Sequence, residues 1–91
     1  MANKKHIKGA YDDFADVLYL TSGIIARTKN MEEEAGLVLR YDAKTLKPVG
    51  ATIVDYKEYW LPKRQHLVHR LSRFFGISFE DANKVISATR Q

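Results

Sequence analysis

The stretch that decides the fold is Tyr11-Asp12-Asp13-Phe14-Ala15-Asp16-Val17-Leu18-Tyr19-Leu20, in which carboxylates surround a chain reversal and a run of β-formers follows directly. Asp12 can accept a hydrogen bond from a backbone N–H two residues further on, which closes an Asx-turn. The branched and aromatic side chains of residues 17–20 favour a strand. The stretch therefore predicts a β-hairpin with strands at about residues 5–11 and 16–21 and a turn at 12–15.

A second block of alternating sequence follows. The apolar run Leu37-Val38-Leu39 ends at Tyr41-Asp42, and a polar turn at 43–47 leads into Val49-Gly50-Ala51-Thr52-Ile53-Val54-Asp55. Period-two alternation predicts strands at about 37–42 and 48–55, with Pro48 at the start of its strand or on an edge because it has no N–H to give the ladder.

The segment between the two blocks is less regular. Ser22-Gly23 is typical of a turn, and Ile24-Ile25-Ala26-Arg27-Thr28 is a candidate fifth strand. An acidic loop, Asn30-Met31-Glu32-Glu33-Glu34, is expected to follow it.

The two blocks together resemble a known family, the small bacterial family catalogued as domain of unknown function 2283. Its members carry Tyr-Asp, three residues, then Asp-Val-Leu-Tyr, and later a Gly-centred strand. Here the first motif is Tyr11-Asp12 followed by Asp16-Val17-Leu18-Tyr19, and the resemblance covers about residues 7–55. The family has no assigned activity to pass on. Its members look like products of paired small genes in the manner of antitoxins, which implies a protein partner by analogy.

After Asp55 the hydrophobic period changes from two to about 3.6. Pro62 suits a first helical turn and Gly76 suits the position after a helix, so a helix is expected at about 61–75 with the apolar positions Leu67, Val68, Leu71, Phe74 and Phe75. Ser78 and Asp81 have the spacing of a capping box, which predicts a second helix at about 79–89.

The predicted fold class is α+β in one domain, residues 1–91: an antiparallel β-meander of four to five strands, followed by an αα-hairpin. The hairpin either covers one face of the sheet or pairs with another chain. Its helical tail begins near residue 57.

Composition describes an ordinary globular protein. Of 91 residues, 45% are hydrophobic and 29% charged, which is too apolar for disorder and too interrupted for a membrane span. The basic N-terminus lacks a following apolar segment, so a cytoplasmic location without membrane contact is expected. The absence of cysteine excludes disulfides, thiolate catalysis and cysteine-bound metal.

The net charge of +4 is unevenly distributed along the chain. Residues 1–56 hold eight basic and eight acidic side chains, whereas residues 57–91 hold seven basic and three acidic ones. A basic tail of this kind indicates an acidic protein surface or a polyanion as partner, and a solvated helix face is the alternative.

Few residues suggest chemistry. His66 and His69 are spaced to share a metal ion, but no third ligand follows, and a solvated helix face explains them better. Asp12, Asp13 and Asp16 suit a tight turn better than acid–base work. With no phosphate-binding loop and no nucleophile signature, we expect no enzyme activity, no cofactor and no metal.

Two features of the tail suggest binding. The segment Tyr56-Lys57-Glu58-Tyr59-Trp60-Leu61-Pro62-Lys63-Arg64 mixes aromatic and basic residues, which suits nucleic acid but suits the docking of a helix better. The segment Leu71-Ser72-Arg73-Phe74-Phe75-Gly76-Ile77-Ser78 resembles a helix-turn-helix core. Glu80 and Asp81, however, would then lie near phosphates.

The sequence therefore predicts a protein-binding module that contacts an acidic partner through five tail residues, Trp60, Lys63, Arg64, Arg70 and Arg73. Two alternatives stay open. One is a DNA-binding regulator, with nucleic acid as the partner of the tail. The other is a homodimer joined by the tail's apolar face.

Overall fold

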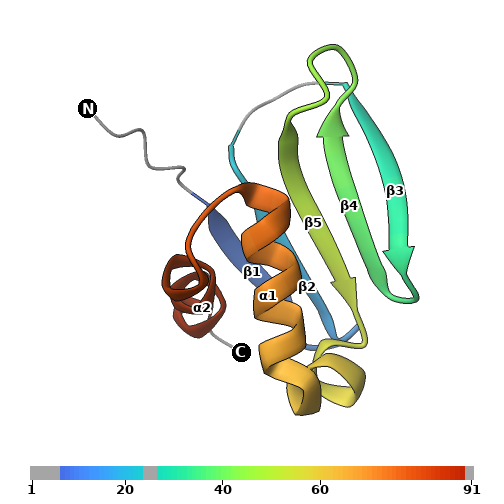
Figure 1. Ribbon diagram of the computed structural model, residues 1–91. Helices are drawn as coiled ribbons and strands as arrows, with labels where there is room; N and C mark the ends of the chain where they lie inside the picture. Colours follow the sequence, from blue (N-terminus) through green and yellow to red (C-terminus); the bar gives the residue numbers. More distant parts are fainter. Residues whose placement is uncertain (1–6, 24–26, 90–91) are drawn as a thin grey trace.

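Five strands form one antiparallel sheet in a computed structural model that describes residues 7–23 and 27–89 (Figure 1). The order across the sheet is β1-β2-β5-β4-β3. β5 therefore joins a β1–β2 hairpin to a β3–β4–β5 meander, and all four pairings are antiparallel. The strands are β1 (Lys8–Asp12), β2 (Val17–Thr21), β3 (Thr28–Glu34), β4 (Leu37–Asp42) and β5 (Pro48–Val54).

A continuous helical path follows the sheet. A π-helical turn η1 (Tyr56–Trp60) and a 3₁₀ turn η2 (Leu61–Lys63) lead into helices α1 (Arg64–Phe75) and α2 (Phe79–Ala88). Gly76 ends α1 with φ 69°, the left-handed conformation that glycine adopts without a steric penalty. The Ser78 side chain accepts a hydrogen bond from the Asp81 N–H at 2.9 Å, so the predicted cap of the second helix is confirmed.

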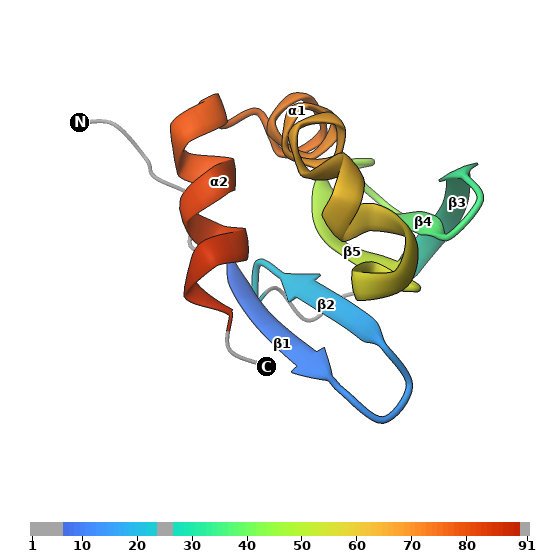
Figure 2. The same ribbon diagram turned by 90° about the horizontal axis from the view of Figure 1, so that it is seen from below.

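Both helices lie on the same face of the sheet, α1 over its middle and α2 beside β1 (Figures 1 and 2). The core between the two layers combines alternate strand residues with one stripe of each helix. Its buried members include Leu18, Leu20, Leu37, Leu39, Ala51, Ile53, Trp60, Leu67, Val68, Leu71, Phe75, Ala82 and Ile86. The apolar face of the tail is thus buried within its own chain, which removes it as a dimer interface.

The predicted α+β class is confirmed, with one error in the strands. The acidic loop expected at residues 30–34 is wrong, because these residues belong to β3 and pair with β4. β3 is the outermost strand and exposes most of its side chains, so it tolerates charges that would not fit a central strand. The proposed strand at 24–28 falls partly on residues 24–26, which lie outside the described residues.

Two aspartates fix the β1–β2 hairpin. Asp12 accepts hydrogen bonds from the N–H groups of Phe14 and Ala15 at 3.0 and 3.1 Å, which confirms the predicted Asx-turn. Asp16 has φ 58° and accepts from the Tyr11 hydroxyl at 2.7 Å.

The Asp16 carboxylate also reaches the start of η1. It accepts hydrogen bonds from the N–H groups of Lys57 and Glu58 at 2.9 and 3.2 Å. Partial burial disfavours its charged form, but these bonds and that of Tyr11 outweigh burial, so the pKa of Asp16 lies below its usual value. The hairpin turn is therefore fastened directly to the helical half of the chain.

Candidate functional site

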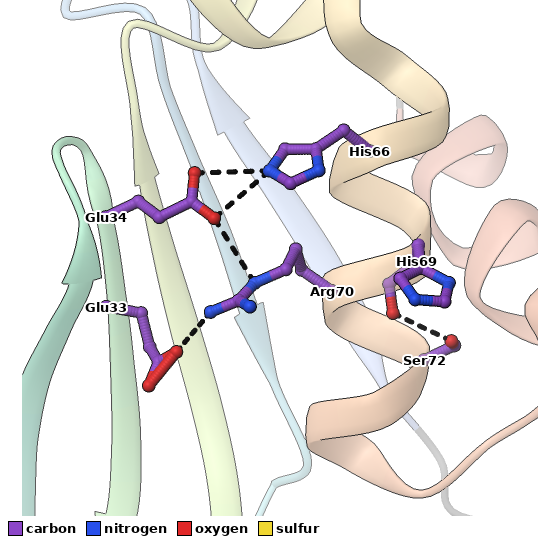
Figure 3. A network of polar contacts seen from close by, with 6 residues as sticks. All are labelled: Glu33, Glu34, His66, His69, Arg70 and Ser72. Carbon is purple, nitrogen blue, oxygen red and sulfur yellow. Dashed lines mark hydrogen bonds and ion pairs between the residues drawn. The ribbon is translucent and has the colours of Figure 1, made fainter.

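One side of α1 faces the β3–β4 hairpin and carries a row of polar residues. His66 and Arg70 are four positions apart and therefore point the same way from the helix. The His66 Nε2 lies 3.1 and 3.2 Å from the two Glu34 oxygens, and the Arg70 Nε lies 3.3 Å from the same carboxylate. Arg70 also pairs with Glu33 (Figure 3). These contacts fasten α1 to the far edge of the sheet.

A groove opens beside this row, between α1 and β4. It is lined by Glu33, Leu39, Tyr41, Arg70, Arg73 and Phe74, and its volume is about 190 Å³. The Phe74 ring meets the Tyr41 ring edge-to-face, with 5.2 Å between centroids. Leu39 is buried, whereas Arg73 is exposed. The groove thus combines aromatic and aliphatic surface with a solvated guanidinium.

The structure separates the five predicted contact residues. Trp60 is 0% exposed, so its assignment as a partner contact is corrected: it is a core residue, and the docking role of the aromatic segment holds for it. Arg64 donates to the Asn83 side chain at 2.8 Å and to the Ser87 hydroxyl at 2.7 Å, which ties α1 to α2.

The remaining three predicted residues differ in whether another side chain of the protein already binds their charged group. Arg70 is held by two glutamates, as described above. The Lys63 ammonium lies 3.9 Å from the centroid of the Tyr59 ring, a cation–π contact on an exposed aromatic. Arg73 makes no ion pair with any residue in the described part of the chain. Of the five, Arg73 is therefore the cation most available to a partner.

In the folded protein, part of the basic tail is paired with acidic residues of the sheet. The sequence segregates basic residues in the tail, but the acidic strand β3 folds against α1 and neutralises Arg70. The sequence did not indicate that two residues of the sheet, Leu39 and Tyr41, line this groove. The alternation along β4 predicts that Leu39 and Tyr41 lie on the same face of the sheet, but only the register and the position of α1 show that they border Arg73.

The other candidate sites stay separate from this groove. His66 and His69 point to different sides of α1 (Figure 3), and the described residues include no group of three His, Cys, Asp or Glu placed to hold a metal ion. A wide depression of about 490 Å³ beside the β4–β5 turn is lined by Arg27, Asp42, Ala43 and Lys44. The exposed face of α2 opens with Glu80, which leaves the helix-turn-helix interpretation without new support.

Comparisons with known proteins identify no relative. No protein-family model matches the chain, and neither the curated proteins nor the solved structures contain a match. Within residues 7–23 and 27–89, no helix has the length and apolar character needed to cross a bilayer. Any functional conclusion therefore rests on the geometry of the surface.

Proposed function

We propose that this chain is a non-enzymatic protein-binding module that recognises an acidic partner through α1 and the groove beside it. The observation that carries the proposal is the position of Arg73, an exposed guanidinium next to the aromatic pair Tyr41 and Phe74. Arginine and aromatic residues are enriched among the residues that dominate the energetics of protein interfaces.

The surrounding charges favour an acidic partner segment. Arg70 is neutralised by Glu33 and Glu34, so a partner gains little from approaching it. Arg73, in contrast, makes no ion pair within the described residues, so its charge is available to a partner. Lys29 pairs with Tyr41 in the β3–β4 register and so lies on the groove face of the sheet. A carboxylate with an adjacent apolar side chain complements this combination.

The family resemblance of residues 7–55 adds a candidate for the partner. If this chain is encoded in a pair of small genes, in the manner of an antitoxin, its partner is the product of the neighbouring gene. Co-expression of the two proteins, followed by purification through a tag on one of them, tests this pairing.

The role of the groove is tested by charge reversal. Arg73→Glu should weaken binding of the co-purified partner, or of a fluorescein-labelled acidic peptide with one aromatic residue, by about tenfold, which corresponds to ~1.4 kcal/mol. The stability of the chain should hardly change, because an exposed charge contributes little to folding.

Lys84→Glu on α2 is the matched control, since Lys84 is also an exposed cation of a helix. Arg70→Glu is a poorer probe, because it places a third carboxylate beside Glu33 and Glu34. Equal binding by wild-type, Arg73→Glu and Lys84→Glu proteins would remove α1 from the recognition surface.

A further inference from the structure

Basic side chains gather at the end of the sheet where β4 turns into β5. This turn, residues 43–47, lies at the opposite end of the sheet from the β1–β2 and β3–β4 turns (Figure 1). The Ala43 N–H donates to the Arg27 carbonyl oxygen at 2.8 Å, so the residue before β3 lies beside the turn. The register sets Lys29 against Tyr41 and Asn30 against Arg40, close to the same turn. We call this region the basic end, with the five cations Arg27, Lys29, Arg40, Lys44 and Lys47.

The charges of the basic end are hardly compensated. Segments 27–30 and 40–48, which build it, contain one acidic residue, Asp42. One Asp42 oxygen accepts hydrogen bonds from the N–H groups of Lys44 and Thr45 at 2.8 and 3.2 Å, so this carboxylate closes the turn. Within residues 7–23 and 27–89, none of the five cations forms an ion pair. The basic end therefore has an excess of four positive charges.

The opposite end of the molecule is acidic. Eight of the eleven acidic side chains lie around the β1–β2 turn, the β3–β4 turn and η1, namely Asp12, Asp13, Asp16, Glu32, Glu33, Glu34, Asp55 and Glu58. Lys57, Lys63 and Arg64 lie at this end too but are outnumbered. The fold thus separates charges of opposite sign, and its field directs a polyanion to the basic end.

We propose that the basic end binds the phosphate backbone of a nucleic acid and does not read its base sequence. The cations lie on both sides of the sheet, because Lys29 shares a face with Tyr41 whereas Arg40, the neighbour of Tyr41 in β4, lies on the other face. Arg27 and Lys44, together with Asp42 and Ala43, line the depression of about 490 Å³ described above, which has room for a phosphate group.

The spread of the cations favours a polymer over a small anion. Residues 40–44 span roughly 13 Å at the rise of an extended chain. A nucleic acid strand carries one phosphate per ~3.4 Å of helix axis, so about four phosphates fall within this length. A single small anion would reach only part of the set.

The composition of the basic end favours phosphate over an acidic protein. Three of its five cations are lysines, which are depleted at protein interfaces. Its turn has no aromatic residue, and Leu46 is the one large apolar side chain of residues 42–48. Protein interfaces depend on buried aromatic anchors, whereas lysine, arginine, threonine and backbone N–H groups are the usual contacts of phosphates. Without an aromatic surface for base stacking, binding should not depend on sequence.

This binding goes beyond the proposed function and does not use Arg70 or Arg73 of the groove. The first test is fluorescence anisotropy of the full chain with a fluorescein-labelled DNA duplex. If about four phosphates are neutralised, the dissociation constant should rise roughly 100-fold between about 50 and 200 mM NaCl, because counterions are released on binding. A duplex of unrelated sequence should bind within about fivefold. Absence of binding at the lower salt concentration, or a larger sequence preference, would overturn the proposal.

Charge reversal locates the binding surface. Lys44→Glu with Lys47→Glu should raise the dissociation constant for the duplex by about tenfold or more. Lys57→Glu with Lys63→Glu is the matched control, because it changes the net charge equally at the acidic end and both lysines are exposed. Equal weakening by the two double variants would show an effect of net charge alone and contradict a local site.

Two further measurements keep the test independent of folding and of partner class. Lys44→Gln with Lys47→Gln is a milder pair, which should lower the slope of log Kd against log salt concentration by about two; an unchanged slope would remove both lysines from the site. Unlabelled duplex should displace the labelled duplex about tenfold more effectively than poly-L-glutamate at equal concentration of charge. Equal displacement by poly-L-glutamate would assign the basic end to acidic protein surfaces and overturn the proposal.

Discussion

Replacement of Asp16 should be the most damaging change at any exposed turn of this protein. Asp16→Ala removes an anionic acceptor from one hydroxyl and two backbone N–H groups. A hydrogen bond to a charged group contributes ~1.5–3 kcal/mol when buried, but water can replace part of each bond at this half-exposed site. Alanine also costs ~1 kcal/mol or more at φ 58°. Together these losses should lower the free energy of unfolding by about 3 kcal/mol.

Two companion variants separate the contributions. Asp16→Gly loses the same hydrogen bonds but adopts a positive φ freely, so it should be about 1 kcal/mol more stable than Asp16→Ala. Asp16→Asn tolerates the backbone conformation and keeps one acceptor oxygen, so its loss should be smaller still. Urea denaturation measures all three, and the alanine variant should melt about 12–24 °C below wild type.

A free energy of unfolding for Asp16→Ala within about 0.5 kcal/mol of wild type would show that these hydrogen bonds contribute little to stability. Equal stability of the glycine and alanine variants would show that the backbone contribution is absent. A spectroscopic readout is independent of stability: the hydrogen bond to Asp16, together with partial burial, raises the pKa of Tyr11 to about 12. In Asp16→Asn this tyrosine should titrate closer to its ordinary value near 10.

Three further predictions concern the hairpin, the α2 contact and pH. Asp12→Ala loses the hydrogen bonds of the Asx-turn, so it should lower the free energy of unfolding measured in urea by about 1 kcal/mol and leave partner binding unchanged. Loss of binding in a stable variant would instead give Asp12 a functional role. Gly9→Ala would place a Cβ 2.0 Å from the Thr89 Oγ1, so it should cost about 1–3 kcal/mol, and Thr89→Ala in the same chain should restore part of that loss; no restoration would contradict the packing of Thr89 on β1. Acid should also unfold the protein, because the pKa values of Asp16 and Asp42 lie below the usual value, the latter because backbone N–H groups donate hydrogen bonds to its carboxylate. The contribution of the two carboxylates to the free energy of unfolding is therefore complete above about pH 4 and is lost as the pH falls further. A free energy of unfolding that stays constant between about pH 5 and pH 2 would contradict this prediction.

The sequence predicted those parts of the fold that depend on local pattern. The strand from Val17, the caps at Gly76 and Ser78, and the apolar stripe of α1 follow from periodicity and from single residues with strong preferences. Strand β3 was missed because pairing with β4, rather than its own composition, makes it a strand. An edge strand needs few apolar residues, so a run of glutamates gives no sign of it.

The candidate site was harder to predict for a related reason. The partners of Arg64 and Arg70 lie 19 and 37 residues away in the chain, so no local pattern marks these arginines as occupied. Trp60 combines high partner-binding propensity with high burial propensity, and sequence alone does not choose between them. Of the three arginines of α1, only Arg73 is exposed.

The central place of β5 has a consequence for synthesis. β1 and β2 are made first, but the strand that joins them to the rest of the sheet is the last of the five, and Val17 pairs with Val54. An isolated two-stranded hairpin is marginally stable in water. A nascent chain therefore has no stable sheet until residue 54 has left the ribosome, and its core is complete only after α2, which ends at Ala88, has followed. Folding of the sheet should therefore start only after β5 has been made, and a chain stalled before residue 54 should not form it.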